Sequence, residues 1–137
     1  MTDANDFPVT RPTRPGTWKV VARSKKVSEN WDEFSNQASG ECQRVYDQLA
    51  TNPLYDDGDR QQRLGGEAGR VTYNGVQYER RQIDVTDGGR VWYFVDPTPL
   101  GSGQKRRLGK VVIDMVATGH PKKTEKKPGG KRRPGRK

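Results

Sequence analysis

The chain has 137 residues, with 26 lysines and arginines against 17 aspartates and glutamates, one histidine and one cysteine. This length fits one modest domain and excludes a large multidomain enzyme. Only 29% of the residues are apolar, which is low for a globular protein. The formal net charge of +9 suits a polyanionic partner, so its distribution along the chain decides what it means.

Positive charge is concentrated near the C-terminus. Residues 122–137 hold nine basic residues and one acidic residue, which gives this segment a net charge of +8 and leaves +1 for residues 1–121. The lone Cys42 excludes an internal disulfide and favours a reducing compartment. No apolar run approaches the roughly 18–20 residues of a membrane span, and the first residues contain no signal-peptide core. We therefore expect a soluble, cytoplasmic protein without a membrane partner.

The first elements follow from proline content and alternation. Residues 1–17 contain three prolines and little to bury, which predicts a flexible N-terminal arm. The segment from Trp18 to Arg23 predicts a short strand, with Val20 and Ala22 on one face and Val21 on the other.

A helical hairpin is predicted next. Apolar residues recur four, three and four positions apart, which is one face of a helix, at Val27, Trp31, Phe34 and Ala38. Ser28 is the expected N-cap of this helix. After Ser39 and Gly40 the pattern resumes with Cys42, Val45, Tyr46, Leu49 and Ala50, until Asn52–Pro53 stops it. We expect two antiparallel helices, with Cys42, Trp18, Trp31 and Phe34 contributing to the core.

The second half of the chain changes to a period of two. Residues 55–69 are polar and glycine-rich, which predicts a loop, and Asn74–Gly75 predicts a tight hairpin turn. Further strands are expected at residues 90–96 and 110–117. The predicted fold is α+β, a helical hairpin packed on a small antiparallel sheet over residues 18–120, followed by a disordered basic tail at 121–137.

The candidate site residues are cations. A single histidine and a single cysteine cannot build a zinc site, and no phosphate-binding loop is present, so no metal or cofactor is expected. Alternation places Arg80 and Arg81 on opposite faces, and it places Arg90 on one face with Trp92 and Phe94. If the strands pair through the turn at 87–89, one of these arginines, Arg90 and residues 120–123 meet on one surface.

Such a cationic surface suits a phosphodiester substrate. Guanidinium groups stabilise the charge of a phosphoryl transition state, and His120 is able to move a proton near neutral pH. The alternative is that these are ordinary solvated strand and edge charges. Trp92 is expected either to stack on a base or to pack in the core. Tyr93 is expected either to pack in the core or to take part in catalysis.

Three stretches in this order resemble the RelE/ParE superfamily of toxin–antitoxin toxins. They are Leu49–Pro53 after the helical hairpin, the strand Gly88–Asp96 (GGRVWYFVD), and Thr118–Glu125 (TGHPKKTE). The resemblance covers residues 18–125. It implies a RelE-like endoribonuclease, or mRNA interferase, that cleaves mRNA on the ribosome, inhibits translation and is held in check by a cognate antitoxin protein.

The resemblance also implies site residues. Arg90 matches the central arginine of the family, and Arg80 or Arg81 falls near its basic pair on the preceding strand. Lys123 stands where an arginine often follows the last strand, and His120 lies close to the histidine that certain relatives use. The expected catalytic residues are Arg81, Arg90, His120 and Lys123, with cations stabilising the phosphate while an RNA 2′-OH attacks it. The closing tyrosine of several members is missing, because Lys126 and Lys127 occupy that neighbourhood. Residues expected to bind nucleic acid are Arg80, Lys122, Lys126, Lys127, Lys131, Arg132, Arg133 and Arg136. Their contacts with phosphates are sequence-independent and weaken with salt, and the alternative for the tail is a solubilising extension.

Two other functions stay open at this point. One is a ParE-like inhibitor of DNA gyrase, which needs no catalytic residues. The other is a non-catalytic nucleic-acid-binding accessory protein, in which the fold presents the basic tail.

Overall fold

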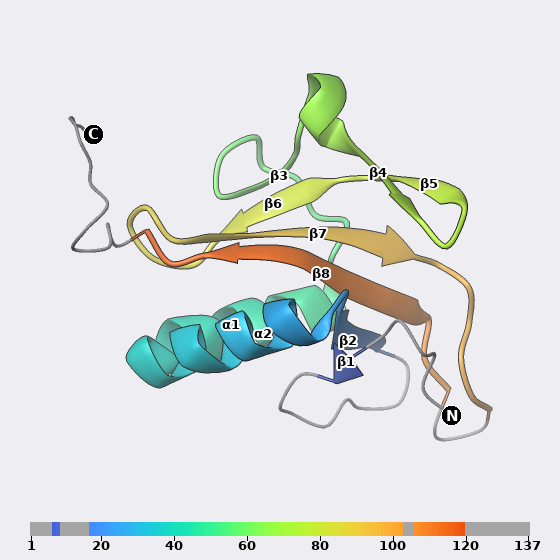
Figure 1. Ribbon diagram of the computed structural model, residues 1–137. Helices are drawn as coiled ribbons and strands as arrows, with labels where there is room; N and C mark the ends of the chain where they lie inside the picture. Colours follow the sequence, from blue (N-terminus) through green and yellow to red (C-terminus); the bar gives the residue numbers. More distant parts are fainter. Residues whose placement is uncertain (1–6, 9–16, 103–105, 120–137) are drawn as a thin grey trace.

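The computed structural model describes residues 7–8, 17–102 and 106–119 (Figure 1). Its fold class is α+β, as the sequence predicts. The elements in chain order are β1 (Phe7–Pro8), β2 (Trp18–Ala22), α1 (Lys25–Gln37), α2 (Ser39–Thr51), β3 (Gln61–Arg63), the 3₁₀ helix η1 (Gly66–Gly69), β4 (Arg70–Tyr73), β5 (Val76–Glu79), β6 (Arg81–Asp84), β7 (Arg90–Asp96) and β8 (Gly109–Ala117).

The main sheet is mixed, which corrects the prediction of an antiparallel sheet. Its strand order is β1-β2-β8-β7-β6-β3. Strand β2 runs parallel to β8, from Trp18 opposite Gly109 to Ala22 opposite Ile113. The other pairs, β7 with β8 among them, are antiparallel. The helices and several strands separate β2 from β8 in the chain, so no tight hairpin forces the pair to be antiparallel.

The helical hairpin forms as predicted, but its start differs. Helix α1 begins at Lys25, and its cap is Ser24, whose hydroxyl accepts the Val27 N–H at 3.2 Å. The prediction of Ser28 as the cap is wrong, since Ser28 already lies in the first helical turn. A one-residue break at Ala38 separates α1 from α2. The two helices pack side by side under one face of the sheet (Figure 1).

The main core lies between the helices and this face of the sheet. The predicted apolar stripe of α1 supplies Trp31 and Phe34, and Cys42 of α2 is 2% exposed. Burial raises the pKa of the Cys42 thiol. Val20 and Ala22 belong to this core, as do Val91 and Tyr93, so the predicted facing of both strands is confirmed. Trp18 packs against it from the edge.

A second, smaller core covers the opposite face of the sheet. Val21, Phe94 and Val112 point to this side and meet the hairpin formed by β4 and β5. The ring of Phe94 lies 5.2 Å from that of Tyr73 and 4.9 Å from that of Tyr78. The hairpin has the predicted turn, with positive φ at residues 74 and 75. It forms a separate two-stranded layer and does not extend the main sheet (Figure 1).

The segment 55–69, predicted as a loop, contains the edge strand β3 and the short helix η1. The Gln61 N–H donates to Asp57 Oδ1 and the Arg63 N–H to Asp56 Oδ2, both at 3.1 Å. These backbone hydrogen bonds lower the pKa of both aspartates. The carboxylates therefore occupy the outward donors of β3, which blocks this edge against a further strand.

The opposite edge is formed by part of the predicted N-terminal arm. Phe7 and Pro8 pair antiparallel with Ala22 and Val21 as β1, and Phe7 packs against the main core. The expectation of a flexible arm with little to bury therefore does not hold for Phe7 and Pro8. Residues 1–6 and 9–16 of the arm, like the predicted tail, lie outside the described part of the chain.

A buried ion pair joins the layers at a bulge in β8. Trp92 pairs with Met115 and Tyr93 with Ile113, so Asp114 has no partner across the strand pair. Its side chain is 7% exposed and binds two guanidinium groups, that of Arg23 after β2 and that of Arg80 between β5 and β6. The Arg80 Nη2–Oδ2 distance is 2.9 Å.

We predict that Asp114→Ala lowers the free energy of unfolding by about 2–4 kcal/mol, because it leaves two partly buried guanidinium groups without a carboxylate. Urea unfolding followed by circular dichroism measures the change. The matched control is Arg63→Ala, which breaks exposed ion pairs of a side chain that is 61% exposed and should cost less than about 1 kcal/mol. Equal, small losses in both variants would contradict a stabilising role for Asp114.

Candidate nucleic-acid interface

Arg90 lies at the start of β7 on the sheet face opposite the helices. Alternation from the buried residues Val91 and Tyr93 places Arg90 there together with Trp92. Its side chain is exposed, and Nη1 donates to the Gly88 carbonyl at 3.4 Å. Among the described residues, no carboxylate forms an ion pair with Arg90. Its charge is therefore available to an anion from solvent.

One acidic group moderates this charge. Asp84 of β6 is the direct neighbour of Arg90 across the strand pair. Partial burial raises the pKa of Asp84, while the positive charges of Arg60 and Arg90 act against that rise. Arg90 is exposed, whereas Asp84 is half-buried, so Arg90 is the more accessible of the two to a ligand.

Arg80 lies on the same face as Arg90 but is already bound. Its guanidinium pairs with Asp114, donates to the Ala68 carbonyl at 3.0 Å, and lies 5.1 Å from the centre of the Trp92 ring. Its side chain is 16% exposed. The structure thus gives this predicted nucleic-acid-binding residue a role inside the protein.

Arg81 lies on the other face of the sheet, as predicted from alternation. It is paired with Tyr93 across the strands, and its side chain is 11% exposed. Nη2 donates to Glu79 Oε1 at 3.2 Å and Nη1 to the Leu54 carbonyl at 3.4 Å. Arg81 and Arg90 therefore do not share one surface, and of the two predicted partners only Arg80 is on the side of Arg90.

Trp92 is partly exposed, although the residues on either side of it in β7 are fully buried. Its indole Nε1 donates to Gln82 Oε1 at 2.9 Å, and Gln82 is its partner across β6 and β7. Alternation along single strands does not connect these two residues. The predicted turn at 87–89 could have revealed this pair. If the two strands are paired residue by residue away from the turn, Gln82 stands opposite Trp92.

The described chain ends beside Arg90. Ala117 pairs with Arg90, and Gly119 packs against the turn between β6 and β7 (Figure 1). A Cβ atom on Gly119 would lie 2.4 Å from the carbonyl carbon of Gly88, so only glycine fits this contact. The predicted site residues His120, Lys122, Lys123, Lys126, Lys127, Lys131, Arg132, Arg133 and Arg136 lie outside the described residues. The basic segment is joined to the domain at this corner.

Tyr93 has a structural role. Its side chain is fully buried, its hydroxyl donates to the Pro53 carbonyl at 2.7 Å, and it accepts from Gln61 Nε2 at 3.0 Å. Gln61 in turn accepts from Gln48 of α2. Burial raises the pKa of Tyr93 to about 12. The interpretation of Tyr93 as a core residue is confirmed.

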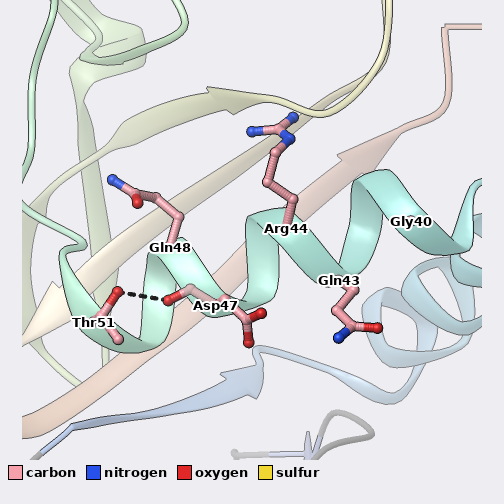
Figure 2. A pocket seen from close by; sticks show the side chains of 6 residues that line it. All are labelled: Gly40, Gln43, Arg44, Asp47, Gln48 and Thr51. Atoms are coloured by element: carbon pink, nitrogen blue, oxygen red, sulfur yellow. Dashed lines mark hydrogen bonds between the residues drawn. The ribbon is translucent and has the colours of Figure 1, made fainter.

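A shallow hollow of about 510 Å³ lies along the exposed side of α2 (Figure 2). Polar residues of α2 and Gly40 line it, and none of the predicted site residues contributes to it. Arg44 crosses from the helix to the end of β6, where it donates to the carbonyls of Asp84 and Val85 at 3.2 Å. Thr51 is hydrogen-bonded to the carbonyl of Asp47 (Figure 2). The two Arg44 hydrogen bonds fasten α2 to the sheet.

Within the described residues, no three His, Cys, Asp or Glu side chains gather as metal ligands. Neither described helix has the length and apolarity that crossing a membrane requires. Comparison with family models, with curated proteins and with solved structures gives no match.

We predict that alkaline pH destabilises the fold through Tyr93. In the unfolded chain the phenol ionises near pH 10, whereas in the folded protein it stays neutral to about pH 12. The unfolded state thus loses its proton first, and the free energy of unfolding falls by about 2–3 kcal/mol between these values. Urea titrations across this range should show a smaller fall for Tyr93→Phe. Equal pH dependence in both proteins would contradict the prediction.

Proposed function

We propose that the protein binds RNA through the sheet face that carries Arg90, and that it cleaves RNA as a RelE-like endoribonuclease. One observation carries this proposal. Arg90 is exposed, has no carboxylate bound to it among the described residues, and lies where a segment of net charge +8 joins the domain. Further cations, Lys122 and Lys123, follow Gly119 within four residues in the sequence.

The reaction proposed is an internal phosphoryl transfer. The RNA 2′-oxygen forms a bond to the adjacent phosphorus while the bond to the 5′-oxygen breaks, which leaves a 2′,3′-cyclic phosphate and a 5′-hydroxyl. Arg90 stabilises the extra negative charge on the phosphate oxygens. His120 and Lys123, which follow β8 in the sequence, are the proposed proton carrier and second cation. A cognate antitoxin that covers Arg90 would stop both binding and cleavage.

A second candidate is a non-catalytic RNA-binding protein. The ion pairs of Arg80 with Asp114 and of Arg81 with Glu79 favour it, because they leave Arg90 as the one exposed residue of these three arginines. A single guanidinium is enough to bind a phosphate, whereas cleavage also needs groups that move protons.

Expression of the full chain in a bacterial host, with mapping of RNA 5′ ends, separates the two candidates. We predict cleavage phased with codons, and a loss of at least about 100-fold in Arg90→Ala, the size expected when a transition-state donor is removed. The control Arg63→Ala removes an exposed arginine on another strand and should cleave like the parent protein. RNA binding with intact RNA would favour the second candidate. Growth arrest with DNA damage and intact RNA would contradict both and point to gyrase.

A separate prediction concerns the basic segment, residues 122–137. Removal of residues 126–137 takes away seven basic residues, so RNA affinity should fall and its dependence on salt concentration should become shallower. Fluorescence anisotropy with a labelled RNA at several salt concentrations measures both quantities. Thermal unfolding of the same variant should be unchanged, because these residues lie beyond β8. An unchanged salt slope would remove this segment from the interface.

A further inference from the structure

We propose that Trp92 and Gln82 form a recognition site for one unpaired RNA base, beside the phosphate that Arg90 binds. This inference rests on the proposed RNA binding and adds a preference for single strands and for certain bases. Trp92 and Arg90 are two residues apart on β7, and side chains at that spacing lie about 6.6 Å apart on the same face. A base and its own phosphate group can therefore contact both.

The Trp92 ring is held in place before any ligand arrives. Arg80 lies against it, with the guanidinium carbon 5.1 Å from the ring centre, and Asp114 fixes Arg80 from the other side. The indole N–H is fixed by Gln82. A ring fixed in this way loses little conformational freedom when a base stacks on its accessible surface, which favours binding.

Gln82 supplies the hydrogen bond that can distinguish bases. An indole N–H only donates, so the carboxamide oxygen of Gln82 must be the atom that faces Trp92. The amide nitrogen of Gln82 consequently points elsewhere, and within the described part of the chain it has no hydrogen-bond partner. Its two N–H donors match a carbonyl oxygen, which uracil, cytosine and guanine carry, whereas adenine offers ring nitrogens as its only acceptors.

The charges and the aromatic ring together favour single-stranded RNA as the occupant. Arg90 and the basic segment complement phosphates, whereas Asp84 beside Arg90 limits this face to few of them. Bases in a duplex are stacked and paired, and so they cannot place a ring on Trp92. Stacking on aromatic side chains is the usual way in which single strands are held.

The test measures binding of the full chain to labelled oligouridylate and oligoadenylate at several salt concentrations. We expect Trp92→Leu to weaken binding of oligouridylate by about 5- to 100-fold, the range found for one stacked base. The salt slope should stay the same, because stacking releases no counterions. Trp92→Phe, which retains a ring, should lose less. The control Tyr55→Leu removes an aromatic side chain that is 46% exposed and follows Leu54, whose carbonyl binds Arg81 on the other face, and it should bind like the parent protein.

Gln82→Ala tests base selection, and it also removes the acceptor of the Trp92 N–H. The parent protein should bind oligouridylate more tightly than oligoadenylate, and the variant should bind the two equally. A duplex of matching sequence should compete poorly for the parent protein. Equal binding of single strand and duplex, or a base preference that Gln82→Ala leaves intact, would overturn the inference.

The result for Arg90 distinguishes a failure of this inference from a failure of the proposed function. If Arg90→Ala weakens RNA binding while Trp92→Leu and Trp92→Phe, both shown to be folded by thermal unfolding, bind normally, RNA binding stands and the base site is wrong. If no variant changes RNA binding, both proposals are wrong. Quenching of tryptophan fluorescence by oligouridylate, lost in Trp92→Phe, provides a second measure of direct stacking.

Discussion

The buried carboxylate of Asp114 is the contact on which the arrangement of this molecule depends. A bulge in β8 turns this residue out of the strand pairing and toward the hairpin side of the sheet. There it binds Arg23, which follows β2 and leads into the helices, and Arg80, from the point where the chain returns from the hairpin to the sheet. A half-satisfied group at this depth would be costly, so the three side chains specify one another's positions.

The same contact determines which arginines can meet a ligand. Arg80 is bound to Asp114 and lies on the Trp92 ring, and Arg81, on the opposite face, is bound to Glu79. Arg90 remains exposed at the corner where β8 ends. The proposed site is therefore narrower than a general basic patch. It consists of one exposed guanidinium and one fixed aromatic ring, and the basic segment of the chain is attached beside them.

Opposite this face, a second polar network secures the helices. The hydroxyl of the buried Tyr93 binds the carbonyl of Pro53 just after α2, and Gln61 joins the same group from β3. The predicted helix stop at Asn52–Pro53 thus also serves as an anchor for the central strand. Because both faces of β7 carry such fixed contacts, the position of Arg90 at its start is well defined relative to the rest of the sheet.

The sequence by itself determined the features that depend on neighbouring residues. Periodicity located the helical hairpin and the faces of β2 and β7, and Asn74–Gly75 located the tight turn, because these follow from the local geometry of the backbone. It could not determine that β2 lies parallel to β8, or that the hairpin forms its own layer, because both depend on packing between distant segments. The sequence also could not show which carboxylates bind Arg80 and Arg81. Alternation gives the face on which a side chain lies, but only the tertiary structure brings Asp114 to one arginine and Glu79 to the other, and so decides that Arg90 keeps its charge for a ligand.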